Sequence, residues 1–418
     1  MTIGSPNLSL GSNNAADLMQ LKRLAAQPHL TYCTNIHAGE SWDEISQSLS
    51  LFVPTIRDAV ADGAPMGIGL RLSGQAAFSL NEPSVLQAFQ TQLKALNAYV
   101  FTLNAFPYGT FHGVPVKQDV YAPDWTHAER LRYTLACIDI LTALLPEGMD
   151  GSISTVPVGF RDACEAPDAI PQVVSHLLQC VGHMVGIKRQ TGKHIALALE
   201  PEPACYLETT QEASHFIQTH VRSEKAVTEL AQALACSTEL AQQALAEHVG
   251  VCFDVCHSAV EFEDPALALH DLRKAGIAIP KIQLSSAVRI PQMTAEQLPN
   301  LQAFDDAVYL HQVVVEQAGH LTRFVDLPGA VTAFHAGQAQ GEWRVHCHVP
   351  VFLQDAGAIS TTQAQLLQTL EACKREGYSS HLEVETYTWD VLPAALKTDS
   401  KAQAIARELL FVKKVLLA

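Results

Sequence analysis

The sequence predicts a single (β/α)8 barrel, for three reasons. Short apolar segments with strand character alternate with longer helical patterns about eight times along the chain, and this order is typical of a parallel sheet covered by helices. Polar residues recur where these strands end, which is the face that carries the active site in such barrels. The runner-up, an open doubly wound sheet, lacks a glycine-rich GxGxxG turn after the first strand.

The strands and helices follow from the period of the apolar residues. In chain order, the predicted strands are residues 30–37, 66–72, 98–106, 151–159, 194–202, 249–257, 281–287 and 381–387. Segments such as 83–98 and 129–145 carry apolar residues at i, i+3 and i+4, as amphipathic helices do. We predict a partly flexible N-terminal segment over residues 1–25 and one barrel domain over residues 26–418.

A long insertion, residues 288–380, precedes the last predicted strand. It contains the strand-like run 343–352, whose two histidines share one face. A closed ring of eight strands has no ninth place, so we expect the insertion to cover the carboxyl-terminal mouth as part of a long loop. In an alternative register, residues 344–349 form the seventh strand and residues 281–285 lie outside the barrel.

Composition and charge exclude several classes of protein. The 418 residues are 48% hydrophobic and 17% charged, which permits a large core and argues against disorder. The formal net charge of −16 argues against a nucleic-acid partner and against attachment to anionic lipid. We therefore expect a small polar metabolite as the partner. The oligomeric state is left open.

The cysteines and the apolar runs indicate a cytoplasmic location. Ten cysteines are spread thinly through apolar segments and form no CxxC pair, as expected for reduced, buried thiols. The first residues lack a basic start followed by an apolar stretch, so we expect no signal peptide. No uninterrupted apolar run approaches the roughly 20 residues of a membrane span, so we expect no membrane insertion.

Three predicted strands end in a carboxylate that points into the barrel. Alternation along 195–200 puts Glu200 on the inward face, and the same counting places Asp254 and Glu385 at the mouth. One layer deeper, we expect Glu383 to pair with an inward cation such as Lys281. Three carboxylates that converge without a counter-charge repel one another, and a divalent cation removes that repulsion.

We therefore predict a metal site at the mouth, with Zn, Mn, Co or Fe as the candidate ions. Carboxylates combined with imidazoles suit these ions better than calcium, which prefers oxygen ligands only. The predicted metal ligands are Glu200, Asp254, His257, Gln283, His346, His348 and Glu385. Each has a structural alternative. Asp254 is also suited to cap a helix, the two histidines of 343–352 to a solvated edge strand, and Gln283 to bonding its neighbours.

The order of these residues resembles that of the xylose isomerase-like barrels, a superfamily of sugar isomerases, ketose 3-epimerases and the endonuclease IV type of repair enzyme. The shared order is Glu, DxxH, a polar residue, a two-ligand "HCH" segment and Glu. The strings "LTYCTNIHAGESW", "LNAFPYGTFHG", "YAPDWTHAERLRYT" and "LEVETYTWDVLP" resemble the EboE-type metabolite traffic proteins. This chain departs from the epimerases and the repair enzyme at Gln283, where they usually carry a histidine.

The early strand ends look suited to a polar substrate rather than to a metal. The predicted substrate-binding residues are Asn35, His37, Arg71, Asn104, Tyr108 and His112. Arg71 could clamp a carboxylate or a phosphate through two hydrogen bonds. The glycine-containing loop 106–113 could close on a ligand.

Three functions compete at this point. The preferred one is a metal-dependent isomerase or epimerase of a polyhydroxylated metabolite, with Glu200 and Glu385 as the acid/base pair; the resemblance adds a place in metabolite traffic. The alternative is a metabolite-binding or carrier protein on the same barrel. The third is an endonuclease IV-like phosphodiesterase, which the net charge of −16 and the missing early histidines disfavour.

Overall fold

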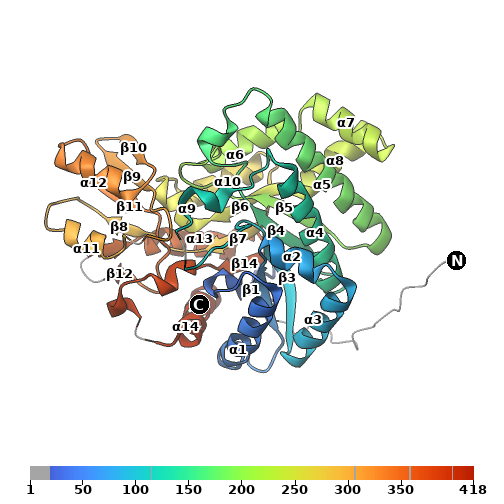
Figure 1. Ribbon diagram of the computed structural model, residues 1–418, viewed down its shortest axis with the longest axis horizontal. Coiled ribbons are helices and arrows are strands. Elements are labelled where there is room, and N and C mark those ends of the chain that lie inside the picture. The colour runs from blue at the N-terminus through green and yellow to red at the C-terminus, as the bar shows by residue number, and fades with distance from the viewer. Residues whose placement is uncertain (1–18, 114, 306, 357–358, 398) are drawn as a thin grey trace.

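Eight parallel strands form a closed barrel in the computed structural model (Figure 1), which describes residues 19–418 except 114, 306, 357–358 and 398. Most of the segment predicted to be flexible, residues 1–25, therefore lies outside the described residues. The barrel strands are β1 (His29–Tyr32), β2 (Met66–Arg71), β3 (Ala98–Asn104), β4 (Gly151–Thr155), β5 (Ile195–Leu199), β6 (Val249–Asp254), β7 (Ala278–Leu284) and β14 (His381–Val384). The order of neighbours is β1-β14-β7-β6-β5-β4-β3-β2, and a parallel bridge between Cys33 and Gly69 joins its two ends. The predicted barrel is confirmed.

Helices surround the strands on the outside of the barrel (Figure 1). They are α1 (Trp42–Val60), α2 (Gly74–Leu80), α3 (Pro83–Ala95), α4 (Ala128–Leu144), α5 (Ala169–Thr191), α6 (Thr210–Phe216), α7 (Glu224–Leu234), α8 (Thr238–His248), α9 (Val255–Val260), α10 (Pro265–Lys274), α13 (Gln363–Glu376) and α14 (Lys401–Leu417). Eight of these twelve helices begin with a side-chain cap, and α3, α4, α5 and α13 do not. For example, the Ser41 side chain accepts the Glu44 amide while the Glu44 carboxylate accepts the Ser41 amide, which satisfies two groups that a helix start leaves free.

The insertion forms a second, antiparallel sheet beside the barrel, on the left of Figure 1. Its strands and helices are β8 (Val288–Ile290), α11 (Leu298–Gln302), β9 (Val313–Gln317), β10 (His320–Phe324), α12 (Leu327–His335), β11 (Glu342–Val345), β12 (Asp355–Ala356) and β13 (Ile359–Thr361). Strand β11 pairs antiparallel with β8 and β9, whereas β7 pairs in parallel with β6 and β14. The alternative register, with residues 344–349 as the seventh barrel strand, is therefore wrong.

A buried ion pair fills the barrel below the mouth. Lys281 of β7 and Glu383 of β14 have no exposed side-chain surface and form a salt bridge, as predicted. The Lys281 ammonium also lies 3.2 Å from Ser154 Oγ and 3.4 Å from the Leu103 carbonyl oxygen. Gly69 of β2 faces this pair, and a Cβ there would collide with the Glu383 carboxylate. The interior charge pair thus requires glycine at this position of β2.

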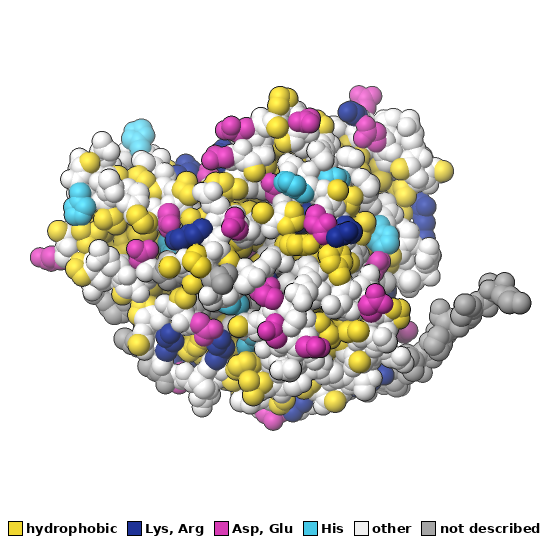
Figure 2. Space-filling model, in the orientation of Figure 1, with side chains coloured by type: hydrophobic (Ala, Val, Ile, Leu, Met, Phe, Trp, Pro, Cys, Tyr) yellow, Lys and Arg dark blue, Asp and Glu magenta, His cyan; other side chains and the backbone are white. Residues whose placement is uncertain are grey.

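The surface carries charges of both signs. On the face shown in Figure 2, acidic side chains are spread over the barrel and the inserted sheet, with scattered Lys and Arg between them. That face presents no continuous basic area of the kind that binds nucleic acid. Among the described helices, none is both long and apolar enough to cross a bilayer.

Glu408 of α14 is a buried carboxyl whose ionisation opposes folding. Its Oε1 accepts hydrogen bonds from the Val351 amide (3.0 Å) and the Thr386 hydroxyl (2.7 Å). Burial raises the pKa of Glu408 from 4.5 to about 7. Between these values the folded state binds more protons than the unfolded state, so the free energy of unfolding falls as the pH rises.

We expect Glu408→Gln to remove that loss, because a Gln oxygen can accept the same two hydrogen bonds. The variant should be more stable than the wild type near pH 8, by up to about 3 kcal/mol, and similar below pH 4.5. Urea unfolding across this pH range measures the difference. Glu165→Gln, at an exposed position, is the control; a Glu408→Gln curve parallel to the wild type would contradict the assignment.

Candidate active site

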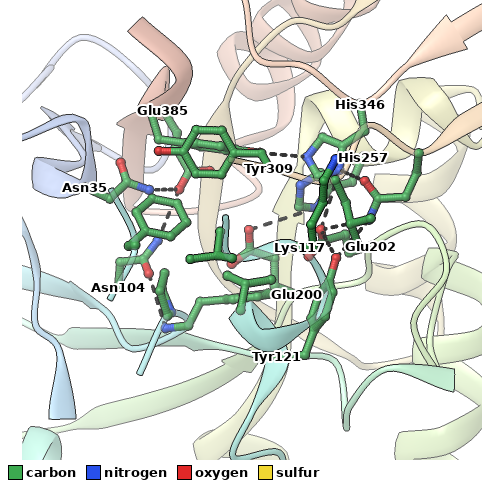
Figure 3. A pocket seen from close by; sticks show the side chains of 18 residues that line it. Asn35, Asn104, Lys117, Tyr121, Glu200, Glu202, His257, Tyr309, His346 and Glu385 are labelled. Carbon is green, nitrogen blue, oxygen red and sulfur yellow. Dashed lines mark hydrogen bonds and ion pairs between the residues drawn. The ribbon is translucent and has the colours of Figure 1, made fainter. Parts of the chain in front are cut away.

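The ends of β5, β6, β7 and β14 bring polar side chains to one place at the barrel mouth. Figure 3 shows Glu200, His257 and Glu385 of this group. Asp254 and Gln283 are register partners on β6 and β7, and Gln283 is the partner of Glu383 on β14. Glu385 lies two residues beyond Glu383, and Glu200 directly follows β5. Because side chains alternate along a strand, this register turns these groups toward the same interior space.

Three carboxylates form the floor of this space. Oxygens of Glu200, Asp254 and Glu385 lie within 4.8 Å of one another, and all three side chains are buried. The amide nitrogen of Gln283 lies 2.8 Å from Glu200 Oε1 and 3.3 Å from Asp254 Oδ2, and it also donates to Glu385 Oε2. Asn35 and Asn104 donate to Glu385 Oε1, at 2.7 Å and 3.1 Å.

Burial and mutual repulsion make the carboxylates differ in acidity. Burial, and then the charges of Glu385 and Asp254, raise the pKa of Glu200 well above its usual range. Burial, and then the charges of Asp254 and Glu383, do the same to the pKa of Glu385. Burial also opposes the ionisation of Asp254, but the charges of His257 and His348 outweigh it and lower its pKa. Three carboxyl groups this close together therefore oppose one another's ionisation unless a cation lies among them.

Asp254 both caps a helix and belongs to the site. Its Oδ1 accepts the backbone amide of His257 (3.0 Å), which begins the short helix α9, and the Ser285 hydroxyl (2.8 Å). These two bonds fix the carboxylate so that Oδ2 faces Gln283. The cap interpretation of the DxxH segment is therefore confirmed, and its carboxylate also lies in the buried cluster, where its role as a ligand stays a prediction.

Histidines complete the site on the side of the insertion. Nδ1 of His257 lies 2.9 Å from the Pro201 carbonyl oxygen, and Nδ1 of His348 lies 2.8 Å from that of Glu385. A carbonyl oxygen can only accept, so both Nδ1 atoms carry a proton and each Nε2 is the nitrogen left for a ligand. Burial lowers the pKa of His348 to about 4. Both rings have the tautomer and second-nitrogen bond that metal-ligating histidines commonly show.

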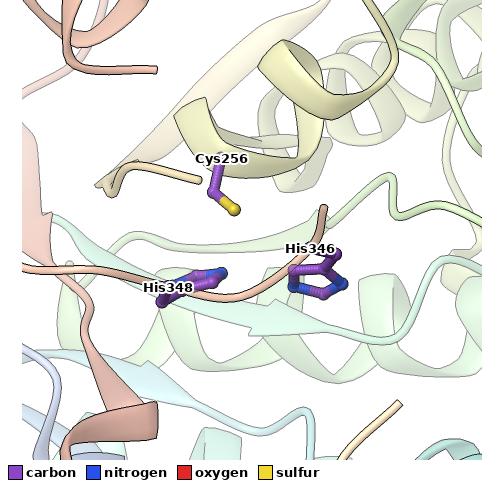
Figure 4. A group of neighbouring side chains, drawn as sticks. All are labelled: Cys256, His346 and His348. Atoms are coloured by element: carbon purple, nitrogen blue, oxygen red, sulfur yellow. The ribbon is translucent and has the colours of Figure 1, made fainter. Parts of the chain in front are cut away.

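These residues fit a divalent metal ion. Two buried atoms of the cluster, Glu200 Oε2 and His348 Nε2, have no hydrogen-bond partner, which is costly unless a ligand satisfies them. Ligand atoms of Asp254, His257 and His348 lie within 4.8 Å of one another, and so do those of Cys256, His346 and His348 (Figure 4). The donor set of carboxylates and neutral imidazoles matches zinc, manganese, cobalt or iron.

Gln283 and His346 differ from the other predicted metal ligands, because protein groups already occupy the atoms that they turn toward the site. Gln283 is surrounded by carboxylate oxygens, so its nitrogen rather than its oxygen faces them. It holds the carboxylates together as a hydrogen-bond donor in this arrangement. His346 Nδ1 bonds Gln312 Oε1 at 2.8 Å, and its Nε2 lies 3.4 Å from the Tyr387 hydroxyl.

The predicted substrate-binding residues divide into two groups. Asn35 and Asn104 line the mouth pocket, which has about 510 Å³ of space, part of it open to solvent. His112 supports this pocket from behind, with Nε2 2.6 Å from the Asn35 carbonyl oxygen and Nδ1 2.9 Å from the Tyr309 hydroxyl.

His37, Arg71 and Tyr108 are absent from the described lining of the pocket. His37 bonds the Tyr32 hydroxyl (3.0 Å) and stacks on Phe52. The Tyr108 hydroxyl donates to the Glu129 carboxylate (2.6 Å).

Arg71 also has protein partners for its guanidinium group. It is paired with Glu40 (3.1 Å) and donates to the carbonyl oxygens of Gly39 and Gly109, each at 2.9 Å. Its two terminal nitrogens thus hold the loops of the mouth, whereas its buried Nε has no hydrogen-bond partner.

Sequence reasoning missed a second layer of site residues. Glu202 is buried beside the floor and accepts the Tyr121 hydroxyl at 2.6 Å. Gln312 of the insertion donates to Tyr121 (2.8 Å) while its oxygen faces His346. The sequence "EPEP" that directly follows β5 repeats the Glu-Pro pair of Glu200, and this repeat could have identified Glu202 as a second site residue. The sequence around Gln312 and Tyr309 contains no such signal, because these residues reach the site only through the docking of the insertion onto the barrel.

Comparisons with known proteins find similar structures but no similar sequence. No family model matches the chain, and no curated protein does. A xylose isomerase-like barrel protein from Mycobacterium smegmatis in complex with magnesium is 11% identical, with 93% of this chain and 96% of that chain covered and a TM-score of 0.49. An L-ribulose 3-epimerase is 13% identical, with 93% and 94% covered and a TM-score of 0.47. The IolI protein with a zinc atom is 14% identical, with 93% and 97% covered and a TM-score of 0.45.

Proposed function

We propose that this protein is a metal-dependent isomerase or epimerase of a small polyhydroxylated metabolite, acting within metabolite traffic. The observation that carries the proposal is the buried group of Glu200, Asp254 and Glu385 beside His257 and His348 at the barrel mouth. In barrels of this type the mouth is where catalysis occurs. The ligands proposed for the metal are the three carboxylates with His257 and His348, with His346 on the side of the insertion.

Two carboxyl groups are placed to move a proton. The chemistry that a bound divalent cation supplies is polarisation of a carbonyl and its neighbouring hydroxyl, which acidifies the adjacent C–H bond. Glu200 Oε2 has no protein partner and is the proposed atom that takes this proton. Glu385 follows β14, on a different part of the strand ring from Glu200. It is the proposed proton donor to the opposite face of the substrate. Asn35 and Asn104 fix its Oε1, so its orientation is set before a substrate binds.

One observation favours a second candidate, a metabolite-binding protein without turnover. The Gln283 amide bonds all three floor carboxylates, so the cluster has internal partners for most of its oxygens. A protein that only binds its ligand could retain such a floor. Exchange of a substrate proton separates the two candidates, because binding alone leaves the C–H bonds intact.

The test combines metal analysis with hydrogen exchange. We expect mildly purified protein to hold about one equivalent of Zn, Mn, Co or Fe, and less than about a tenth of an equivalent contradicts the proposal. The loaded protein is then incubated with a panel of ketoses, aldoses and polyol ketones in deuterated water. Solvent deuterium at a carbon next to a carbonyl supports the isomerase or epimerase. Calorimetric binding without deuterium uptake supports the binding protein instead.

A further inference from the structure

The mouth pocket combines a polar floor with an apolar wall. Its polar lining includes Glu200, Glu385, His257 and His346. The wall includes Phe106, Phe111, Val116, Val120 and Leu310, contributed by the segment after β3 and by the insertion. These segments are tied together, because the Val308 carbonyl oxygen accepts the amides of Val116 (2.8 Å) and Lys117 (3.1 Å). The wall is therefore a built part of the pocket.

Positive charge in the pocket already has partners. In the described lining, Lys117 is the one lysine or arginine, and its ammonium lies 2.9 Å from Asp326 Oδ2. Asp326 is itself held by the backbone amides of His311 and Leu327, each at 3.0 Å. Arg71, the predicted anion clamp, is 2% exposed and bonded to Glu40 and loop carbonyls.

Negative charge dominates the floor. Glu202 adds a fourth buried carboxyl group to Glu200, Asp254 and Glu385, with its Oε1 3.5 Å from His346 Nδ1. Four carboxyl groups already share this space, so a phosphate or carboxylate on the ligand would add a further negative group beside them at low dielectric.

We infer that the metabolite is uncharged and amphipathic, with a polyhydroxylated end for the floor and an apolar substituent against the wall. The inference rests on the proposed function for the chemistry at the floor, and it adds the class of substrate. It disfavours sugar phosphates and sugar acids, because Lys117, the one lysine or arginine of the described lining, is already paired with Asp326. It disfavours free sugars, because they leave the apolar wall uncovered.

The test compares three probes on the full-length, metal-loaded protein by calorimetry. The probes are phenyl β-D-glucoside, glucose and glucose 6-phosphate, which share one sugar and differ in apolar area and charge. We expect the phenyl glucoside to bind about tenfold more tightly than glucose, because its ring covers the wall. Glucose 6-phosphate should bind about tenfold more weakly than glucose.

Val120→Lys tests the wall directly. Val120 is partly buried in the wall, so a lysine there can keep its ammonium at the pocket and supply the missing cation. We expect the phenyl glucoside to lose its advantage and glucose 6-phosphate to gain affinity. Val174→Lys, at a partly buried position of α5 outside the described pocket lining, is the matched control and should leave the order unchanged.

Several outcomes overturn the inference. The inference is wrong if glucose 6-phosphate binds the wild type as tightly as the phenyl glucoside. It is also wrong if the phenyl glucoside shows no binding at millimolar concentration. The third contradicting result is that Val120→Lys leaves the order of the three probe affinities unchanged. Metal content is measured on the same samples. Failure of the proposed function therefore shows as missing metal or missing deuterium exchange, whereas failure of this inference shows in the relative affinities alone.

Discussion

Glu385→Gln is expected to lower the rate of deuterium exchange by about 10²- to 10⁴-fold, the usual contribution of a positioned acid or base. The substitution keeps the shape of the side chain. A Gln oxygen at this position can still accept from Asn35 and Asn104, as Glu385 Oε1 does. The variant loses the ionisable oxygen that faces Gln283. It thereby also loses the oxygen proposed as a metal ligand. The loss should appear in kcat/KM, with metal content measured alongside.

Glu408→Gln is the control for this experiment. Glu408 is another buried glutamate near the end of β14, and its hydroxyl partner, Thr386, directly follows Glu385. It does not belong to the described lining of the mouth pocket. Its variant should keep the exchange rate within about twofold, since it touches no group proposed to react. Equal loss in both variants would trace the effect to folding and would remove Glu385 from the proposed proton transfer.

Lys281→Met is expected to cost about 3–5 kcal/mol of the free energy of unfolding. Lys281 and Glu383 are fully buried and paired, so the substitution leaves an uncompensated carboxylate inside the barrel. Methionine has a similar length and no charge, so the loss comes from the missing partner and not from a large cavity. Urea unfolding at neutral pH measures this change.

The double variant Lys281→Met/Glu383→Leu distinguishes this cause from general disruption of the core. Replacing both members of a buried pair with apolar side chains is often close to neutral. We expect the double variant to recover most of the stability that the single variant loses. A double variant less stable than Lys281→Met would show that the packing around Gly69 and Glu383, rather than the unpaired charge, governs the effect.

Much of the barrel and of its floor could be predicted from the sequence. A period of two along a strand fixes which side chains share a face, so counting along the strands is enough to turn Glu200, Asp254 and Glu385 inward. The same counting predicted the Lys281–Glu383 pair, which the structure confirms. These predictions work because they depend on local geometry and on the parallel register that the barrel imposes.

The positions of Arg71 and Gln312 could not be predicted in this way. Arg71 stands at the end of a strand, as a substrate ligand would, but its partner Glu40 lies on another loop of the mouth. Gln312 reaches the floor only because the inserted sheet packs beside the barrel. Contacts of this kind depend on how separate segments dock, and no short-range pattern in the chain records that docking.

The sequence by itself determined the barrel, the inward carboxylates and the buried charge pair, because each follows from the repeat of the backbone. The tertiary structure alone decided which lysine and arginine side chains face the pocket and which are paired with carboxylates. It also decided that the insertion supplies part of the pocket wall. The reason is physical. A periodic backbone orients neighbouring side chains within an element, whereas the partner of a charged group depends on distant residues that meet only in the folded chain.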